Sequence, residues 1–433
     1  MPESNRAVGL DIGTSRVCIV VAEKDEFGEL KVIAKSSSHS EGLRRATVVN
    51  INKTFAAIKT AVADVEREAS LVIQGVNVAL SGAHVHCIES SSEISINQSG
   101  IVNESDVHRF LEKARANIQN LDANHEVIHV LPQEFIVDDQ DRLLDPIGMA
   151  GTTMRGTVYI VVGLKTRIRN IRQCVERAGL KIGALTFKPV ALGMAVIKER
   201  EKNGGVLVID IGGGTTEVAV YLRGAINYSE VINVAANDIT LDIAHGVEVN
   251  AEIAEVLKVQ YGYALTQLNV KDEDIVINSS EGHSQRSFPK SSLTMIIEAR
   301  MMEIFELVRD AVMASGYYDE INAGIILTGG GALLPGVVEL ARLVFGLDVR
   351  IGYPEALSAG IQSDLYSPMD ATVMGLVAHV YGSNYSGDHS FATAREAPLE
   401  LPPAPVEEVL VVQEQGVAWK KVVDGLQEWW AKL

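Results

Sequence analysis

The sequence predicts an α/β fold in which two similar halves face each other across a phosphate-binding cleft. Residues 8–15 and 206–217 both read as an apolar strand that ends in Asp-Ile-Gly and turns back through small hydroxyl residues into another strand. Their aspartates, Asp11 and Asp210, lie 199 residues apart, a spacing too long for a solenoid and suited to a duplicated domain. A third glycine-rich segment, residues 325–336, follows in the second half.

Composition limits the classes of function. The 433 residues are 47% hydrophobic and 22% charged, which is ordinary globular usage and suits two to four domains. A net charge of −18 argues against wholesale nucleic-acid binding. The widely spaced Cys18, Cys87 and Cys174 indicate free thiols in a reducing compartment. No apolar run is long enough to span a bilayer, and the start of the chain does not read as a signal peptide.

The first half opens with strands and turns over residues 8–33, followed by a helix over 54–69 and a strand over 76–82. Residues 83–165 interrupt this plan with a small α+β unit. Its helix is expected near residues 105–118 with Ser105 as N-cap, and its strands near 126–137 and 158–164.

The second half begins after a helix near residues 166–178 and repeats the opening strand and turn. Further on, a buried strand runs into Gly329, Gly330 and Gly331, and Pro335 suits an early position of the next helix. This arrangement would place exposed backbone and a helix N-terminus beside a flat or anionic ligand. A tight joint between strand and helix would look the same.

The Asp-Ile-Gly turns have the chemistry of a phosphate clamp. Glycine lets backbone N–H groups wrap an anion, and a hydroxyl adds a donor. An aspartate at the strand end can hold the water shell of Mg²⁺. One such turn could be an ordinary glycine hairpin, but two that face each other favour a phosphate site. The chain contains no GxxxxGK[ST] motif, which excludes a P-loop.

The end of the chain reads as a tether and an amphipathic helix. Residues 383–416 are polar and proline-rich, and all three tryptophans lie in the last 15 residues. Over residues 417–433 the apolar side chains form one helical face, and lysines lie on the other. That face, which we expect to enter a membrane interface, consists of Trp419, Val422, Val423, Leu426, Trp429, Trp430 and Leu433. The alternative is a helix that docks on the protein itself or on a partner.

The three glycine elements, in this order, resemble the actin/Hsp70/sugar-kinase superfamily, and within it the chain is most similar to the FtsA family of bacterial cell-division proteins. The resemblance covers essentially the whole chain. It rests on DIGTS, LSGAH at 80–84, HVLPQEF at 129–135, DIGGGTTEVAVY, AEVLKVQYGYA at 254–264 and TGGGALLPG.

This resemblance implies actin-like duplicated domains around a nucleotide cleft, with an extra small α+β subdomain and a C-terminal amphipathic helix. The implied division is domain 1 at 1–82, 166–196 and 367–382; the extra subdomain at 83–165; the core of domain 2 at 197–236 and 316–366; its small lobe at 237–315; a linker at 383–416; and the membrane helix at 417–433.

The resemblance also implies the ligands and their residues. Gly13, Thr14 and Ser15 would meet one side of the ATP phosphates, and Gly212, Gly213, Gly214 and Thr215 the other. Asp11 and Asp210 would position Mg²⁺ through water. Glu255 and Lys258 would contact the ribose and adenine, although the pair alone reads as a surface ion pair. The residues expected against the adenosine are Gly329, Gly330 and Ala332.

One position departs from the pattern of several actin-like relatives. Where these have an acid before the proline of Phe-x-Pro, this chain has Lys188. A protonated lysine cannot act as a general base toward water. We therefore expect ATP to be bound but hydrolysed slowly or not at all, so the protein would be at most a weak ATPase.

By resemblance, the protein would tether the tubulin-like division polymer FtsZ to the cytoplasmic face of the inner membrane at the septum, recruit later division proteins and form filaments. The small lobe would receive the C-terminal peptide of FtsZ, with Lys290 and Arg300 paired to its acids; both could equally be solvated helix charges. Two alternatives remain: a soluble ATPase or phosphotransferase of the superfamily, and a related pilus-assembly scaffold. Neither explains the amphipathic tail.

Overall fold

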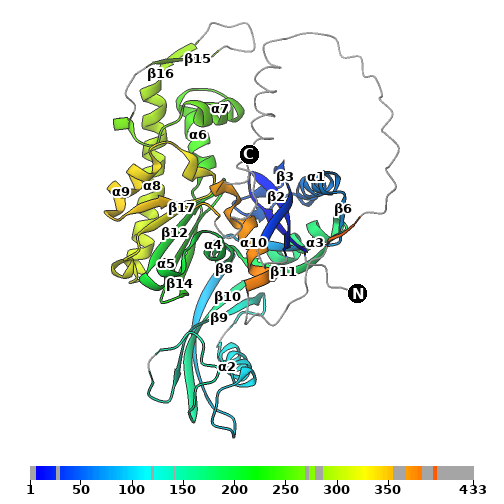
Figure 1. Cartoon of the computed structure of the whole chain (residues 1–433). Coiled ribbons are helices and arrows are strands. Elements are labelled where there is room, and N and C mark those ends of the chain that lie inside the picture. The colour runs from blue at the N-terminus through cyan, green and yellow to red at the C-terminus, as the bar shows by residue number, and fades with distance from the viewer. Residues whose placement is uncertain are drawn as a thin grey trace.

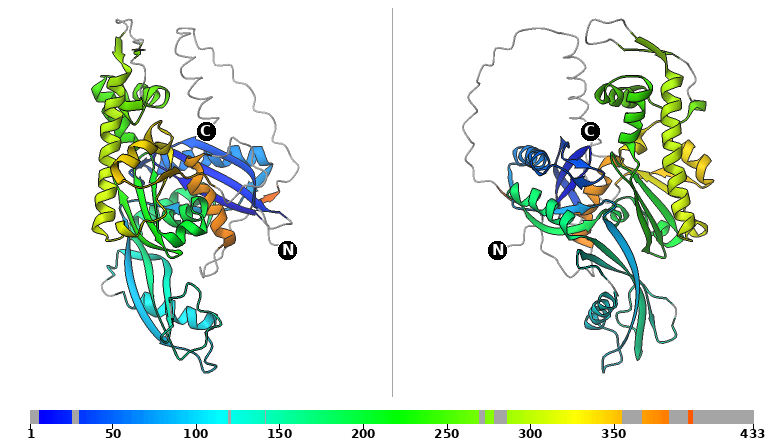
Figure 2. Two further views of the ribbon diagram at one scale, coloured as in Figure 1. Left: turned by 60° about the vertical axis from the view of Figure 1, so that its left-hand side comes forward. Right: turned by 180° about the vertical axis from the view of Figure 1, so that it is seen from behind.

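The computed structural model describes residues 6–25, 30–118, 121–140, 142–268, 273–277, 286–354, 367–382 and 394–396. Two α/β halves lie side by side, and two smaller lobes extend from them (Figure 1). The lobe that carries α2 projects at the opposite end of the molecule from the lobe that carries α6 and α7, in all the views of Figure 2 as well.

The first half is built on a five-stranded sheet in the order β11-β7-β1-β2-β3. Neighbours β1, β2 and β3 are antiparallel, whereas β7 and β11 continue the sheet in parallel. The strands are β1 (Arg6–Ile12), β2 (Arg16–Lys24), β3 (Leu30–His39), β7 (Gly75–Leu80) and β11 (Lys181–Phe187). The helices that pack on it are α1 (Ile51–Ala69), α3 (Lys165–Arg177), α4 (Lys188–Val196) and α10 (Ala371–Gly382).

The second half repeats this plan strand for strand, in the order β14-β13-β12-β17-β18. Again a three-stranded antiparallel meander is followed by two parallel strands. The strands are β12 (Val206–Ile211), β13 (Thr216–Leu222), β14 (Ala225–Ile232), β17 (Ile325–Thr328) and β18 (Val349–Ile351). The predicted duplicated α/β fold is confirmed.

The core of the second half forms because its central strands are apolar on both faces. Every residue of β12 is buried, as expected for a strand covered on both sides. The 25-residue α8 (Lys290–Ala314) lies along the sheet, and its buried residues recur every three or four positions. They include Leu293, Ile297, Met301, Ile304, Phe305 and Val308. The remaining helices and strands of this half and its small lobe are α5 (Glu199–Gly204), α6 (Ala236–Gly246), α7 (Ala251–Tyr261), α9 (Val337–Phe345), β15 (Asp274–Ile277) and β16 (Arg286–Pro289).

The inserted lobe is a three-stranded antiparallel sheet, β8-β10-β9, with one helix packed on it. Its elements are β8 (Val85–Ser95), α2 (Glu104–Ala116), β9 (His125–Val137) and β10 (Thr153–Leu164). The rings of Phe110 and Phe135 meet at 5.2 Å in a core separate from those of the two halves. The expected N-cap Ser105 is wrong: the helix begins after Asn103, because Asn103 and Asp106 form a reciprocal capping box.

The third glycine segment also differs from expectation. A 3₁₀ turn, η3 (Gly330–Leu333), follows β17, and α9 begins only after Gly336, whose φ of 84° lies in the left-handed region. Pro335 therefore precedes the helix instead of occupying its first turn. As a result, backbone of the 3₁₀ turn, and not a helix N-terminus, reaches the cleft.

Part of the expected linker is a strand. Residues 394–396 form β19 (Ala394–Glu396), which pairs antiparallel with β6 (Leu71–Ile73). This is possible because Ala-Arg-Glu contains no proline, so all its N–H groups can take part in a ladder. The membrane helix predicted at 417–433 lies outside the described residues. Within the described ranges, no helix combines the length and apolarity needed to cross a bilayer. The remaining short elements are β4 (Leu43–Arg44), β5 (Thr47–Val48), η1 (Thr266–Leu268), η2 (Tyr318–Glu320) and η5 (Pro368–Asp370).

Candidate functional site

A cavity of about 210 Å³ lies where the Asp-Ile-Gly turns of the two halves meet. The duplicated topology places the ends of β1 and β12 there, and the turn after β17 joins them. Of the predicted ATP-binding residues, all but Ala332 line this cavity. They are Asp11, Gly13, Thr14, Ser15, Asp210, Gly212, Gly213, Gly214, Thr215, Glu255, Lys258, Gly329 and Gly330. Ala332 belongs to the hydrophobic core instead, and its neighbours Gly331 and Leu333 reach the cavity.

The two turns have the same backbone geometry. In the first, the N–H of Gly13 donates to the carbonyl of Arg16 at 2.9 Å; in the second, Gly212 donates to Thr215 at 3.0 Å. A Cβ on Gly13 would lie 2.8 Å from the Arg16 carbonyl oxygen, so this turn needs glycine. Each turn thus leaves a short bare stretch of backbone facing the cavity, as a phosphate-binding loop requires.

The two turns touch each other across the cleft. The hydroxyl of Ser15 donates to the side-chain oxygen of Asn237, at the start of α6, at 3.1 Å. A Cβ on Gly213 would lie 2.0 Å from Ser15 Oγ, and one on Gly214 would lie 2.5 Å from Thr14 Oγ1. Glycine is therefore needed in the second turn because the first turn lies directly against it.

Lys188 brings a cation into the floor of the cleft. It is the first residue of α4, and its Nζ lies 2.5 Å from Asp210 Oδ2 and 3.2 Å from Glu217 Oε2. Glu217 also accepts hydrogen bonds from the hydroxyls of Ser81 and Thr215. Because Lys188 and Ser81 belong to the first half and Glu217 to the second, this network joins the halves beneath the cavity.

Burial and charge act against each other in this network. Burial alone would lower the pKa of Lys188, but the carboxylates of Asp210, Glu217 and Asp11 raise it above its ordinary value. Burial also raises the pKa of Asp11, and it raises that of Asp210 to about 6, with the Lys188 ammonium opposing the rise. Lys188 is thus a charged ammonium at neutral pH and has no free electron pair to accept a proton from water.

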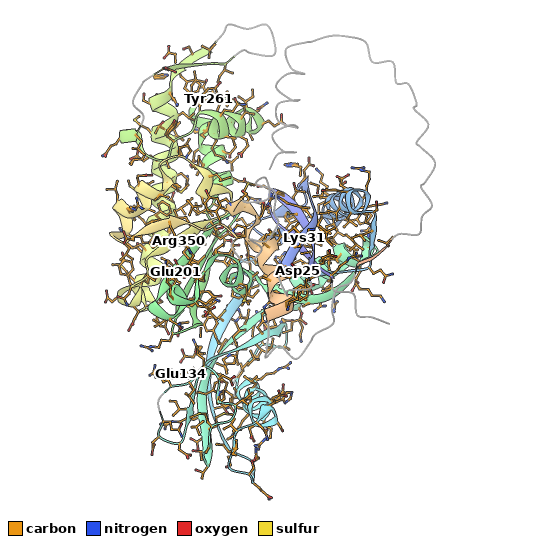
Figure 3. The ribbon with its side chains drawn as sticks, viewed as in Figure 1. Asp25, Lys31, Glu134, Glu201, Tyr261 and Arg350 are labelled. Atoms are coloured by element: carbon orange, nitrogen blue, oxygen red, sulfur yellow. The ribbon has the colours of Figure 1, made fainter. Side chains whose placement is uncertain are left out.

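Helix α4 holds Lys188 rigidly against the second half. The carbonyl of Pro189 accepts a hydrogen bond from Tyr221 at 3.0 Å, and the carbonyl of Val196 accepts one from Arg350 at 2.7 Å. Arg350 also forms a two-pronged ion pair with Glu201, at 2.9 and 2.7 Å; Figure 3 labels both residues in the second half. Hydrogen bonds from the second half therefore hold both the start and the end of α4.

Glu255 and Lys258 form a part-buried pair, in which Lys258 is buried and Glu255 is partly exposed, and not the surface pair that the sequence alone suggests. Lys258 is 6% exposed. Its Nζ donates to Glu255 Oε2 at 2.7 Å, to Thr240 Oγ1 at 2.8 Å and to the Ala236 carbonyl at 3.1 Å. All three donors of the ammonium are used within the protein. The pair lines the cavity and fixes α7 to α6 at its edge.

A second buried charge cluster was not predicted from the sequence. Asp370, fully buried in the turn before α10, pairs with Arg16 at 2.9 Å and with Lys35 at 2.5 Å. Arg16 also donates to the Met369 carbonyl at 2.8 Å. Because Arg16 ends the first phosphate turn, this cluster connects that turn to α10. The residues lie more than 300 positions apart, and no local pattern in the sequence signals the contact.

The acids fit a hydrated magnesium ion only in part. Mg²⁺ prefers one or two carboxylates, waters and phosphate oxygens, and Asp11 and Asp210 both line the cavity. However, the Lys188 ammonium already lies against Asp210. Among the residues that the structure describes, no group of three His, Cys, Asp or Glu side chains is placed to hold a metal ion by itself. Asp11 is therefore a suitable ligand for an ion that arrives with phosphate, whereas Asp210 is already paired with Lys188.

The two expected partner-binding residues both lie on α8, and the charged group of each already contacts another side chain of the protein. Lys290 Nζ lies 4.4 Å from the centre of the Tyr263 ring, a cation–π contact. Arg300 donates to both oxygens of Asp242 on α6, at 2.6 and 3.0 Å, and also pairs with Glu303. An acidic peptide would have to compete with Asp242 for Arg300.

Comparison with known proteins identifies related sequences along most of the chain. The family model "Cell division protein FtsA" matches residues 207–375, and the model "SHS2 domain inserted in FTSA" matches residues 82–162. Similar curated proteins include the cell division proteins FtsA of Neisseria meningitidis serogroup B, 36% identical over 85% of this chain and 88% of that protein, and of Pseudomonas aeruginosa, 34% identical over 90% and 95%. FtsA of Escherichia coli K12 is 33% identical over 88% and 91%.

Solved structures with the same fold are more distant in sequence. A chain of the PilM–PilN type IV pilus biogenesis complex matches with a TM-score of 0.60 at 18% identity, over 87% of this chain and 98% of that one. MreB5 of Spiroplasma citri bound to ADP matches with a TM-score of 0.52 at 14% identity, over 86% and 95%. At these identities the likeness shows the fold alone, which confirms the actin-like architecture.

Proposed function

Because the chain belongs to the FtsA family of cell-division proteins, we propose that it is an ATP-binding, actin-like protein that tethers the division polymer FtsZ to the cytoplasmic membrane at the septum and helps to recruit later division proteins. The observation that carries the nucleotide part is the single cavity onto which both Asp-Ile-Gly turns and the third glycine turn converge. The alternatives of a soluble phosphotransferase and a pilus scaffold have less support, because the curated relatives at 33–36% identity are cell-division proteins.

In the proposed complex, the turns at Gly13–Ser15 and Gly212–Thr215 hold the phosphates of ATP with backbone N–H groups and hydroxyls. Gly329 and Gly330 lie against the adenosine, and the Glu255–Lys258 pair borders the ribose and base. Bound Mg²⁺ would neutralise phosphate charge from the Asp11 side. The MreB5 neighbour was solved with ADP and with AMPPNP, which supports a nucleotide in the cleft of this fold.

The protein is proposed to hydrolyse ATP slowly or not at all. A general base must accept a proton from the attacking water, and the residue that faces the cavity from α4 is the charged Lys188. The nucleotide then acts mainly as a structural ligand that fixes the two halves relative to each other. Such a state would favour head-to-tail contacts between copies, which build filaments.

Membrane attachment is assigned to residues 417–433 on sequence grounds. The side chains of this segment carry three lysines against Asp424 and Glu428, so its charge attracts anionic lipid only weakly. Attachment therefore depends mostly on the apolar face. The test is co-sedimentation with lipid vesicles in Mg-ATP, for the full chain and for a chain that ends at Gly416. Sedimentation of both forms, or of neither, would contradict the assignment.

Two substitutions distinguish the apolar face from the lysines. Trp429→Glu is expected to weaken vesicle binding more than Lys421→Ala, because it removes a large apolar ring and adds a charge that the bilayer interior excludes. The opposite ranking would mean that lipid charge, and not apolar burial, governs attachment.

The FtsZ peptide is assigned to the small lobe around α6, α7 and α8. Lys290 and Arg300 would meet its acids, but the ion pair of Arg300 with Asp242 has to be exchanged in the process. We therefore expect Lys290→Ala to weaken peptide binding more than Arg300→Ala. A titration of labelled FtsZ C-terminal peptide into each variant measures this. Equal binding by wild type and both variants would remove the two residues from the interface.

A further inference from the structure

Lys188 occupies a position in the cleft where nearby carboxylates favour a cation. Three carboxylates surround the cavity floor, those of Asp11, Asp210 and Glu217. The ammonium of Lys188 donates to Glu217 and lies in ion-pair contact with Asp210. It belongs to the first half, and both contacted acids belong to the second.

One N–H donor of Lys188 remains for a ligand. An ammonium has three donors; one of Lys188 is hydrogen-bonded to Glu217, and the ion-pair contact with Asp210 occupies a second side of the ammonium. Lys188 also lines the cavity, as both phosphate turns do. The contrast with Lys258 is clear, because all three donors of Lys258 are used within the protein. Lys188 therefore keeps donor capacity in a cavity that both phosphate turns line, where the phosphates of a nucleotide would lie.

The position of this ammonium is fixed in advance. Its helix is anchored by the Tyr221–Pro189 and Arg350–Val196 hydrogen bonds, so little order has to be gained when a ligand arrives. A preorganised donor in a partly dry site contributes more to binding than one that has to be ordered. A mobile surface lysine would lack this property.

Building on the proposed nucleotide site, we propose that Lys188 is a resident cation of the phosphate site: it donates to the nucleotide polyphosphate and supplies part of the positive charge otherwise provided by Mg²⁺. The affinity for ATP then depends less on Mg²⁺ in the wild type than in a protein without this lysine. The inference concerns binding and is independent of whether ATP is hydrolysed.

The test is equilibrium binding of ATP and of adenosine to the full chain, each with Mg²⁺ and with EDTA. The variants are Lys188→Gln and the double variant Lys188→Gln/Glu217→Gln, which keeps the local net charge and stays informative if the single variant fails to fold. Lys53→Gln is the control, because it makes the same change of charge in an exposed pair with Glu41, remote from the cavity. Circular dichroism melting shows which variants are folded.

In EDTA, the loss of Lys188 is expected to weaken ATP binding by about ten- to a hundredfold, the range for one hydrogen bond to a charged group. With Mg²⁺ the loss should be clearly smaller, and adenosine, which has no phosphate, should bind wild type and variants alike. Equal losses with and without Mg²⁺, or an equal loss for adenosine, would overturn the inference and make Lys188 a purely structural ion pair. Failure of the wild type to bind either ligand would instead refute the nucleotide site itself, and the inference with it.

Discussion

The two halves of the molecule share one strand order and one turn, yet the aspartates of the two turns have different surroundings. Asp11 lines the cavity at the end of β1, and the described structure assigns it no ion pair with a side chain of the opposite half. Asp210, at the equivalent end of β12, is 3% exposed and is in contact with the Lys188 ammonium. The two halves share the backbone plan, but only the aspartate of the second turn is in direct contact with an ammonium.

This difference shows how one lysine can distinguish the two halves of a duplicated site. The backbone of both turns can still bind an anion, since that property depends on glycine and on N–H groups. What changes is where positive charge comes from. Lys188 is in direct contact with Asp210, whereas Lys188 and Arg16 act on Asp11 only through their charge, without an ion pair in the described residues.

The largest effect on the difference between Asp11 and Asp210 is expected from removing Lys188. Lys188→Ala leaves Asp210 and Glu217 buried without their cation, and we expect a loss of about 3–5 kcal/mol in the free energy of unfolding. Asp11→Asn removes no such partner and should change it by less than about 1 kcal/mol. Urea unfolding followed by far-ultraviolet circular dichroism measures both, since the tryptophans all lie in the tail. Recovery in Lys188→Ala/Asp210→Asn/Glu217→Gln would show that unpaired charge is the cause; equal effects of Lys188→Ala and Asp11→Asn would contradict it.

A smaller effect tests the contact between the turns. A methyl group at Gly214 would lie 2.5–2.9 Å from three side-chain atoms of Thr14, so Gly214→Ala has to push the two turns apart. We expect a cost of about 1–3 kcal/mol. Thr14→Ala removes two of the three clashing atoms and should recover part of this cost in the double variant, a non-additive result. Simple additivity in urea unfolding would show that the turns do not touch in solution.

The smallest expected effect is a pH dependence of the free energy of unfolding. It tests the contact that positions the backbone directly before Lys188. The N–H of Phe187, directly before Lys188, donates to Nε2 of His129 in the inserted lobe at 2.9 Å, so this nitrogen has to be unprotonated. Burial, with a further contribution from His379, lowers the pKa of His129 from 6.5 to about 3. The unfolded chain therefore binds the extra proton below pH 6.5, and stability falls as the pH falls through that value.

At about pH 5.5 this group should cost roughly 1.3 kcal/mol relative to neutral pH. His129→Gln keeps an acceptor but cannot titrate, so its urea midpoint should fall less between neutral pH and about pH 5.5 than that of the wild type. Parallel pH profiles of the two proteins would mean that His129 is protonated in the folded state.

Local patterns were sufficient to predict the strands, the glycine turns and the presence of an inserted α+β unit. They were weaker at element boundaries: α1 begins at Ile51, three residues before the expected start, because Asn50 caps it. In α2 the sequence offers Asn103 and Ser105 as caps, and only Asn103 has an acid three residues later to complete the box. The deciding cue, an acid three residues after the cap, is present in the sequence, but a periodicity count does not contain it.

The candidate site shows the same limit over longer distances. The residues of each turn could be predicted because the turn is a local structure. The contacts of Lys188 with Asp210 and of Arg16 with Asp370 could not, because they join strands and helices that meet only in the tertiary fold. In the sequence, Lys188 is notable as the absence of a general base; in the structure it is also a cation in contact with two acids.

The pairing of β19 with β6 also bears on the proposed tether, because it shortens the chain segment between the described body and the last 17 residues. Counted from the end of α10, 34 residues (383–416) would separate the two, a reach of roughly 120 Å at full extension. Counted from the end of β19, only 20 residues (397–416) remain, or roughly 70 Å. If residues 417–433 attach to a membrane as proposed, a force on them would act first on the three residues of β19, so the few backbone hydrogen bonds between β19 and β6 would limit the distance between the body and the membrane.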